Sequence, residues 1–332
     1  MRRLLLFSLL ILLSACGGYS LSPTPAPSPT WRPSPTPFIP QLPTPTLTPS
    51  PSPFPTPTPI PPIPAFKHIV IIVFENKEFD IVIGNPRMAY FNQLAREYTL
   101  LTQYYAITHP SLPNYLAMIG GDTFGIRRNC ENCFLQAPNL TDFLEAGGYT
   151  WKTYQENMPR PCFLGSTLKY AQKHNPFIYF DSIRLDPQRC QNIVPLTELY
   201  TDLEHHTLPN FAFITPDLCH SAHDCGLEVA DAWLKELLSV LWPKLESWGD
   251  PYLMVLTWDE GQGKHSCCGL PEEAGGRVAT VLISPQAQRG FQDNTPYTHY
   301  SLLKTILTAW NLPLLGHAAD ENHVLIEAPF RP

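Results

Sequence analysis

The prolines of this chain are concentrated near its N-terminus. The sequence has 332 residues and 38 prolines, and 19 of these prolines lie within residues 21–64. Proline fixes φ and lacks a backbone donor, so this stretch can form neither a helix nor a central strand. We therefore predict a Pro/Thr/Ser-rich tether over residues 16–65, extended as polyproline II and serving as a spacer, with a docking motif for a proline-binding partner as the alternative. Residues 66–332 can bury one sizeable core.

The first 15 residues predict export. Arg2 and Arg3 precede an apolar run over residues 4–13 that is too short to span a membrane. Residues 13–16, Leu-Ser-Ala-Cys, resemble a bacterial lipobox. We therefore predict a lipoprotein signal peptide over residues 1–15, lipidation of Cys16, and an extracytoplasmic protein anchored to the bacterial cell membrane or envelope. Ordinary cleavage nearby, with Cys16 left as a free thiol, is the alternative.

The charge of the chain disfavours two classes of partner. The formal net charge is −7, and without Arg2 and Arg3 the mature chain has 20 basic against 29 acidic residues. No run of Lys or Arg occurs. Nucleic-acid binding and a general electrostatic hold on anionic lipid both need a basic surface, so we expect neither.

Eight cysteines follow Cys16. An even number in an exported chain indicates up to four disulfides, and the sequence leaves their pairing open. The Cys130-x-x-Cys133 motif could instead form a zinc or redox site, but no second CxxC or suitably spaced histidine pair accompanies it.

Apolar runs alternate with helical patterns in the predicted domain. Strands are expected over residues 68–74, 100–107, 149–154, 210–215, 252–258 and 278–284. Helices are expected over residues 88–98, 139–147, 196–206, 227–248 and 301–310, and another is expected to end at Gly120 and Gly121. This alternation predicts an α/β fold with a mostly parallel sheet and helices on both faces.

Three of the predicted strands run directly into acidic or amide residues. These residues are Glu75 and Asn76 after the first strand, Asp217 after residues 210–215, and Asp259 and Glu260 after residues 252–258. Parallel strands bring such residues to one edge of the sheet, where ligand sites of α/β proteins lie. Crowded carboxylates repel one another unless a cation neutralises them, so we predict one or two divalent metal ions here. The alternative is that each acid caps a helix or turn.

A second segment predicts a nucleophile. Ser111 lies between a predicted strand and a helix, where backbone N–H groups favour an anion, although it could simply be an N-cap. A serine hydroxyl needs a base or a metal to become reactive. There is no Gly-x-Ser-x-Gly elbow, which disfavours an α/β-hydrolase. We predict that His109 and Asn114, in the same segment, contact the substrate.

Histidines complete the predicted site. His223 follows the strand at 210–215, His299 opens the last helix, and His174 lies in a Lys-His-Asn-Pro-Phe segment. Metal ligation, phosphate contact or protonation of a leaving group are the roles considered for them.

Taken together, these segments resemble the bacterial phosphoesterase family that joins phospholipases C and acid phosphatases, including enzymes similar to phosphatidylinositol-3-phosphatase. The resemblance spans residues 67–316 and rests on six motifs in order, which contain Glu75-Asn76, Ser111, Lys173-His174, Asp217 through Asp224, Asp259-Glu260 and His299. It implies a three-layer α/β/α sandwich of the alkaline phosphatase type. It also implies metal binding by Glu75, Asn76, Ser111, Asp259, Glu260 and Asp217, a Ser111 nucleophile, and catalytic roles for His174, His223 and His299.

The implied activity is metal-dependent hydrolysis of phosphate esters through a phosphoserine. A phosphomonoesterase similar to acid phosphatases is expected, acting on a small phosphate ester or a phospholipid head group. A phosphodiesterase of the phospholipase C type is the alternative within enzymes, and a non-catalytic surface-binding lipoprotein is the alternative outside them. A sulfatase is disfavoured because no Cys-x-Pro-x-Arg segment occurs.

Overall fold

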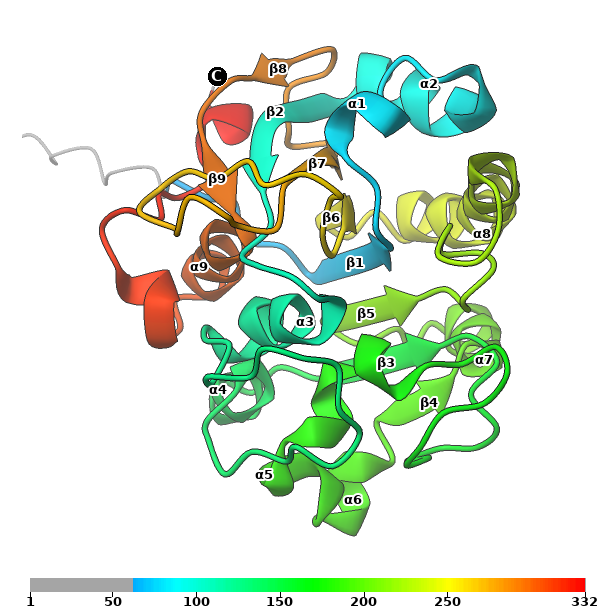
Figure 1. Ribbon diagram of the computed structural model, residues 1–332. Helices are drawn as coiled ribbons and strands as arrows, with labels where there is room; N and C mark the ends of the chain where they lie inside the picture. The colour runs from blue at the N-terminus through cyan, green and yellow to red at the C-terminus, as the bar shows by residue number, and fades with distance from the viewer. Residues whose placement is uncertain (1–61, 332) are drawn as a thin grey trace, which may run out of the picture. The chain divides into compact units, whose positions relative to one another are not determined.

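The computed structural model describes residues 62–331, whose strands form one mixed sheet (Figure 1). The strand order is β4-β3-β5-β1-β6-β7-β2-β8, and β9 pairs with β2. The strands are β1 (His68–Phe74), β2 (Thr99–Tyr105), β3 (Trp151–Gln155), β4 (Ile193–Pro195), β5 (Phe211–Thr215), β6 (Tyr252–Trp258), β7 (Arg277–Ile283), β8 (Gln292–Asp293) and β9 (Tyr297–Thr298).

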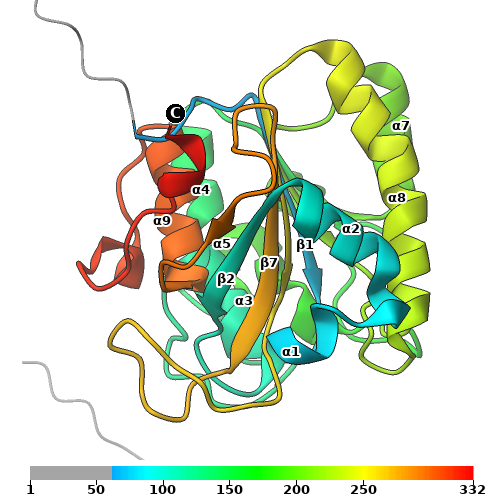
Figure 2. The ribbon, with the colours of Figure 1, turned by 90° about the horizontal axis from the view of Figure 1, so that it is seen from above.

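Helices cover both faces of this sheet (Figure 2). They are α1 (Phe79–Val82), α2 (Ala89–Glu97), α3 (Ser111–Gly120), α4 (Leu140–Ala146), α5 (Asp181–Arg184), α6 (Pro187–Cys190), α7 (Thr197–His205), α8 (Leu227–Trp248) and α9 (His299–Ala309). Short 3-10 helices lie at Pro86–Met88, Gln172–His174, Pro176–Tyr179, Gly316–Ala319 and Ala328–Phe330. Helices α2, α7 and α8 pack on one face, and α3, α4 and α9 pack on the other. The predicted three-layer sandwich is confirmed.

The central strand β1 sets the geometry of the sheet. All seven of its side chains are buried, as its continuous apolar run predicts. It pairs in parallel with β5 on one side and with β6 on the other, and the register places Phe74 beside Trp258. The residues that follow these three strands therefore leave the sheet at one edge.

Strand β7 departs from the parallel pattern. It runs antiparallel to both β6 and β2. Residues 259–276, which join β6 to β7, contain no helix, and without a crossover the chain returns alongside the strand it has left. The other strand pairs are parallel, so the prediction of a mostly parallel sheet is confirmed.

The ends of the helices follow local capping chemistry. Asn139 caps α4 in a reciprocal pair with Asp142, as the sequence predicts. Helix α9 begins two residues before its predicted start because the Thr298 side chain caps it. Helix α3 ends at Gly121, whose φ is 69° and where a Cβ atom would lie 2.4 Å from the Leu315 carbonyl oxygen.

The eight cysteines of the described residues form four disulfides. The pairs are Cys130–Cys133, Cys162–Cys190, Cys219–Cys225 and Cys267–Cys268. This pairing agrees with the predicted number and supplies the connectivity that the sequence leaves open. The sulfurs of the CxxC motif bond to each other, which leaves no thiolate for zinc.

Several predictions concern the N-terminal part of the chain. The signal peptide, Cys16 and nearly all of the tether lie outside the described residues. Within residues 62–331, no helix combines the length and apolar character needed to cross a bilayer.

His68 is a buried titratable residue at the start of β1. Its Nδ1 atom lies 2.8 Å from the carbonyl oxygen of Pro209, and its buried Nε2 atom has no hydrogen-bond partner. Burial, the largest effect, lowers the pKa of His68 below 6.5, although Asp250 lies 3.7 Å away. The unfolded chain therefore takes up a proton at higher pH than the folded chain does. Stability from this residue is present above about pH 6.5 and is lost as the pH falls.

We expect His68→Asn to make the protein less sensitive to acid. Between pH 7 and pH 5, the free energy of unfolding should fall less in the variant than in the wild type, by at most about 1.4 kcal/mol per pH unit. Urea unfolding at several pH values measures this difference. Parallel curves for the two proteins would show that His68 does not contribute.

Candidate active site

The paired ends of β1 and β6 bring three carboxylates together. Glu75 follows β1, and Asp259 and Glu260 follow β6. The backbone N–H of Asp259 donates to the Phe74 carbonyl at 2.9 Å, which continues the strand pairing into this turn. The exposed fractions of Glu75, Asp259 and Glu260 are 0%, 0% and 3%. Burying this much negative charge is costly unless it is compensated.

Ser111 lies among these carboxylates. It is the first residue of α3 and is 1% exposed. Its Oγ atom lies 3.1 Å from Oε2 of Glu75 and 3.1 Å from Oε1 of Glu260. One hydroxyl proton can serve only one of them at a time, so two carboxylate oxygens compete for the same donor. This arrangement is suited to removing the hydroxyl proton.

Glu75 accepts hydrogen bonds on both oxygens. Ser111 faces Oε2, and Tyr115, one turn after Ser111 on α3, donates its hydroxyl to Oε1 at 2.7 Å. Nε2 of His174 lies 3.0 Å from Oε1, within ion-pair distance. Burial opposes ionisation of Glu75, but the neighbouring His174 and Lys173 and the Tyr115 hydrogen bond lower its pKa to about 2. Glu75 is therefore a carboxylate at neutral pH.

The carboxylate of Asp259 has fewer hydrogen-bond donors than that of Glu75. Asn76, with a left-handed φ of 56°, turns its backbone N–H toward Oδ1 of Asp259 at 3.1 Å. The buried Oδ2 atom has no hydrogen-bond partner. Burial, and then the charges of Glu75 and Glu260, raise the pKa of Asp259 well above its usual value. A polar atom left in this state is suited to an electropositive ligand.

These residues fit a divalent cation. Carboxylate, amide and hydroxyl oxygens are the ligands that hard cations such as Mg²⁺, Ca²⁺ and Mn²⁺ prefer. The nearby Lys77 forms no ion pair with these carboxylates within residues 62–331; its Nζ atom donates to the carbonyl of Ala222 at 2.7 Å. The residues that could hold the ion are Glu75, Asn76, Ser111, Asp259 and Glu260.

His109 lies beside this group. Its Nδ1 atom is hydrogen-bonded to Oε2 of Glu260, and its Nε2 atom lies 2.9 Å from the carbonyl oxygen of Gly263. The bond to Glu260 raises the pKa of His109. Because both ring nitrogens face acceptors, the ring compensates the charge of Glu260. Neither nitrogen is then left for the substrate, so the predicted contact between His109 and the substrate would be made by the carbon atoms of the ring.

Asn114 supports the loop before Ser111. Its Oδ1 accepts from the backbone N–H groups of Ile107 and Thr108, and its Nδ2 donates to the carbonyls of Thr108 and Pro110. All of its hydrogen-bonding groups are thus engaged with backbone. The structure places this predicted substrate-binding residue in the support of the nucleophile.

The start of α3 offers an anion fewer donors than the sequence suggests. The N–H of Leu112 already donates to Oδ1 of Asn129 at 3.1 Å, and Pro113 has no N–H. Charge on a bound phosphate must therefore be met largely by other groups.

The three predicted catalytic histidines have different surroundings. His174 is buried against Glu75. His299 is buried, with Nε2 2.6 Å from the Asp259 carbonyl oxygen and Nδ1 3.2 Å from the Tyr104 hydroxyl, and burial lowers its pKa to about 4. His223 is partly exposed, with Nδ1 2.6 Å from Asp224 and Nε2 3.3 Å from Lys173 Nζ. Of the three, His223 has the access that proton exchange with a substrate requires.

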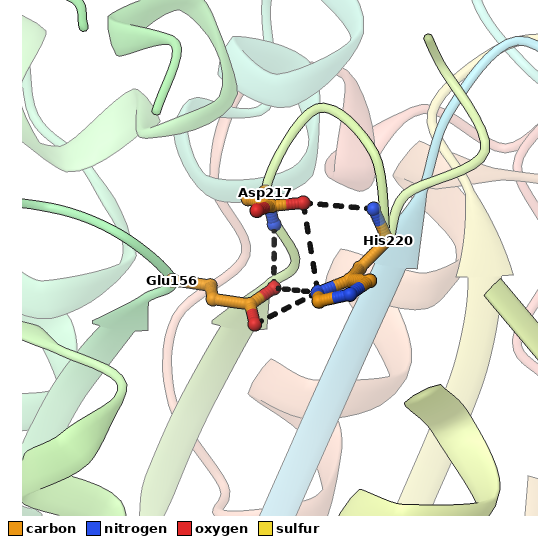
Figure 3. Close-up of side chains that lie close together, drawn as sticks. All are labelled: Glu156, Asp217 and His220. Carbon is orange, nitrogen blue, oxygen red and sulfur yellow. Dashed lines mark hydrogen bonds and ion pairs between the residues drawn. The ribbon is translucent and has the colours of Figure 1, made fainter. Parts of the chain in front are cut away.

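Asp217 belongs to a separate cluster with Glu156 and His220 (Figure 3). Their potential ligand atoms lie within 4.8 Å of one another. The oxygens already accept from protein donors, including the backbone N–H groups of Asp217, Cys219 and His220. Among residues 62–331, Asp217 makes no hydrogen bond or ion pair with the other predicted ligands. The cluster fixes the turn that follows β5.

Sequence reasoning missed Tyr115, although a signal was present. It lies four residues after Ser111, and residues at this spacing share one face of a helix. Glu156 had no such signal, because its partners, Asp217 and Trp233, lie 61 and 77 positions away in the sequence.

Comparison with known proteins identifies the family. The model of the phosphoesterase family matches residues 85–313. The chain belongs to the phosphoesterase family. The predicted membership is therefore confirmed.

Two relatives of this chain illustrate the breadth of the family. The chain is 37% identical to a phosphate-repressible acid phosphatase of Penicillium chrysogenum, in an alignment covering 76% of this chain and 61% of that protein. It is 32% identical to a phosphatidylinositol-3-phosphatase of Mycobacterium tuberculosis, covering 78% and 81%. The chain spans about three fifths of the length of the fungal acid phosphatases it matches.

Solved structures agree on the fold. A protein of the alkaline phosphatase superfamily from Vibrio parahaemolyticus superposes with a TM-score of 0.51 at 12% identity, covering 78% of this chain and 71% of that one. The predicted resemblance to the alkaline phosphatase fold is confirmed.

We expect Asp259→Asn to raise the thermal unfolding midpoint of the chelator-treated protein, because it removes one of three mutually repelling carboxylates. Saturating divalent cation should raise the midpoint of the wild type and have much less effect on the variant, since a ligand that binds only the folded state stabilises it. Thermal unfolding with EDTA, Mg²⁺, Ca²⁺ or Mn²⁺ measures both effects. Glu204→Gln, on the exposed face of α7, is the control. A wild-type midpoint that no cation moves would exclude a metal site here.

Proposed function

We propose that this protein is an exported, metal-dependent phosphomonoesterase that hydrolyses phosphate esters through a phosphoserine at Ser111. The observation that carries the proposal is the position of Ser111 Oγ, 3.1 Å from each of two buried carboxylates beside the unpartnered Oδ2 atom of Asp259. A serine that merely capped a helix would not need this surrounding. The family of the chain, and the names of its acid phosphatase relatives, support the ester class.

The chain's own residues account for the main steps. Ser111 loses its proton to Glu260 as Oγ forms a bond to phosphorus and the bond from phosphorus to the alcohol oxygen breaks. Attack of water on the phosphoserine then breaks the Oγ–P bond, releases inorganic phosphate and restores the hydroxyl. A divalent cation held by Glu75, Asn76, Asp259 and Glu260 would supply a lowered hydroxyl pKa and neutralisation of phosphate charge.

His223 is our candidate for protonating the leaving alcohol. Its contact with Asp224 fixes the ring, and its partial exposure permits exchange of protons with solvent. His174 and His299 lack this access and would act by compensating Glu75 and by holding the Asp259 backbone.

Export and lipid anchoring at Cys16 are part of this proposal. The four disulfides support a location outside the cytoplasm, because such bonds persist in oxidising compartments. Labelling of cells with a radioactive fatty acid tests the anchor: the wild type should be labelled and Cys16→Ala should not.

Ser111→Ala should abolish hydrolysis of p-nitrophenyl phosphate while leaving the thermal midpoint within a few degrees of the wild type. Chelation should suppress the wild-type activity, and added divalent cation should restore it. Ser239→Ala, on the exposed face of α8, is the matched control and should be fully active.

The same assay with bis-p-nitrophenyl phosphate and phosphatidylcholine separates monoester from diester cleavage. Activity retained in Ser111→Ala would remove the nucleophile from its role, and no activity on any ester would favour a binding protein.

His223→Gln should lower kcat by about 10²- to 10⁴-fold for glycerol phosphate, whose alcohol needs a proton in order to leave. It should have a much smaller effect with p-nitrophenyl phosphate, whose leaving group is stable as an anion. Steady-state kinetics on the two esters measures this ratio. Equal losses on both substrates would assign His223 a role other than leaving-group protonation.

A further inference from the structure

Glu78 lies close to the site but does not touch Ser111 or the proposed metal ligands. Its side chain is only 14% exposed. Three of its four hydrogen-bond donors are backbone N–H groups: two lie in the segment that joins β6 to β7, and the third is on the first residue of β7. Oε2 accepts from Gln262 and Gly263 at 3.0 and 2.8 Å, and Oε1 accepts from Arg277 at 2.9 Å. One carboxylate therefore accepts hydrogen bonds from both ends of the segment 262–277.

Glycines leave room for this carboxylate. A Cβ atom at Gly261 would lie 2.1 Å from Oε2 of Glu78, and one at Gly276 would lie 2.6 Å from it. Gly263 is also confined, with a Cβ position 3.0 Å from both oxygens. The carboxylate of Glu78 therefore lies directly against the backbone at Gly261 and Gly276, and a side chain at either position would have to displace it.

The segment in turn orients His109. The carbonyl oxygen of Gly263, whose N–H is held by Glu78, lies 2.9 Å from Nε2 of His109. The opposite ring nitrogen is bonded to Glu260, and Glu260 accepts from Ser111 at 3.1 Å. A continuous series of contacts therefore leads from Glu78 through Gly263, His109 and Glu260 to the nucleophile.

We propose that Glu78 is a positioning residue: by fixing the Gly263 carbonyl it orients the His109 ring against Glu260 and so aligns the carboxylate that faces Ser111. This role rests on the proposed phosphomonoesterase function. The exposed contact of Glu78 with His265 is not part of it, because that side chain is 70% exposed and such pairs contribute little.

The matched control is Asp231, a carboxylate that also holds backbone but lies away from the site. Its oxygens accept from the N–H groups of Tyr90 and Phe91 at 2.8 Å each, at the start of α2. Glu78→Gln and Asp231→Asn each replace one carboxylate oxygen, which accepts hydrogen bonds, by an amide NH₂ group, which can only donate them. Both should lower the thermal midpoint by comparable amounts.

The two variants should differ in catalysis. Glu78→Gln should lower kcat on p-nitrophenyl phosphate by about 10- to 100-fold with KM changed less than twofold, as loss of outer support does at metal and catalytic sites. Asp231→Asn should keep kcat within twofold of the wild type, and so should His265→Ala. The double variant Glu78→Gln/His109→Gln should lose no more than His109→Gln alone, because Glu78 acts through His109.

A readout independent of turnover completes the test. In metal-free protein, the ¹⁵N-detected ring N–H signals of His109, assigned by their loss in His109→Gln, should shift and exchange faster with solvent in Glu78→Gln but not in Asp231→Asn. If Glu78→Gln behaves like Asp231→Asn in kcat and leaves these signals unchanged, or if the double-variant effects are additive, the positioning role is wrong. Retained activity in Ser111→Ala would instead overturn the proposed function, so the two failures are distinguishable.

Discussion

The side-by-side pairing of β1 with β6 forces three carboxylates into one buried edge of the sheet, and the surrounding structure is organised around that charge. The register that places Phe74 beside Trp258 leaves Glu75, Asp259 and Glu260 with almost no contact with water. Donors then gather on them from separate elements: Tyr115 and Ser111 from α3, and the Asn76 backbone from the turn after β1. One oxygen of Asp259 still has no hydrogen-bond partner, and a bound cation would supply the missing positive charge.

The histidines near the site differ in burial and in the groups they contact. His109 is hydrogen-bonded to Glu260 and compensates its charge, whereas His174 lies against Glu75, where burial lowers the pKa of its ring. His299 touches only the backbone of the third, where burial keeps its ring neutral near pH 7. His223 is left with access to solvent and with Asp224 as its partner. The same residue type thus serves charge compensation, support and the proposed proton transfer, according to burial and partner.

Each loop at the site is held by a polar side chain that is largely engaged with backbone. Asn114 ties the loop before Ser111, Glu78 ties the segment between β6 and β7, and Asp217 with Glu156 ties the turn after β5. Loops have few apolar contacts, so hydrogen bonds of this kind are the available means of fixing them. Several of these residues were predicted as substrate or metal contacts, or were not predicted at all, because a motif shows which residue types are present but not which atoms they face.

The sequence by itself determined the six longer strands but not the short strands β4, β8 and β9, together with the main helices, the edge at which the acids gather and the number of disulfides. These follow from local patterns: apolar runs of fixed period, caps and the position of polar residues directly after strands. Tertiary structure decided the antiparallel course of β7, the pairing of the cysteines, the grouping of Asp217 with Glu156 and His220, and the contacts of Tyr115 and Glu78. Such features depend on contacts between residues as much as 199 positions apart, as between Glu78 and Arg277, and no local pattern carries that information.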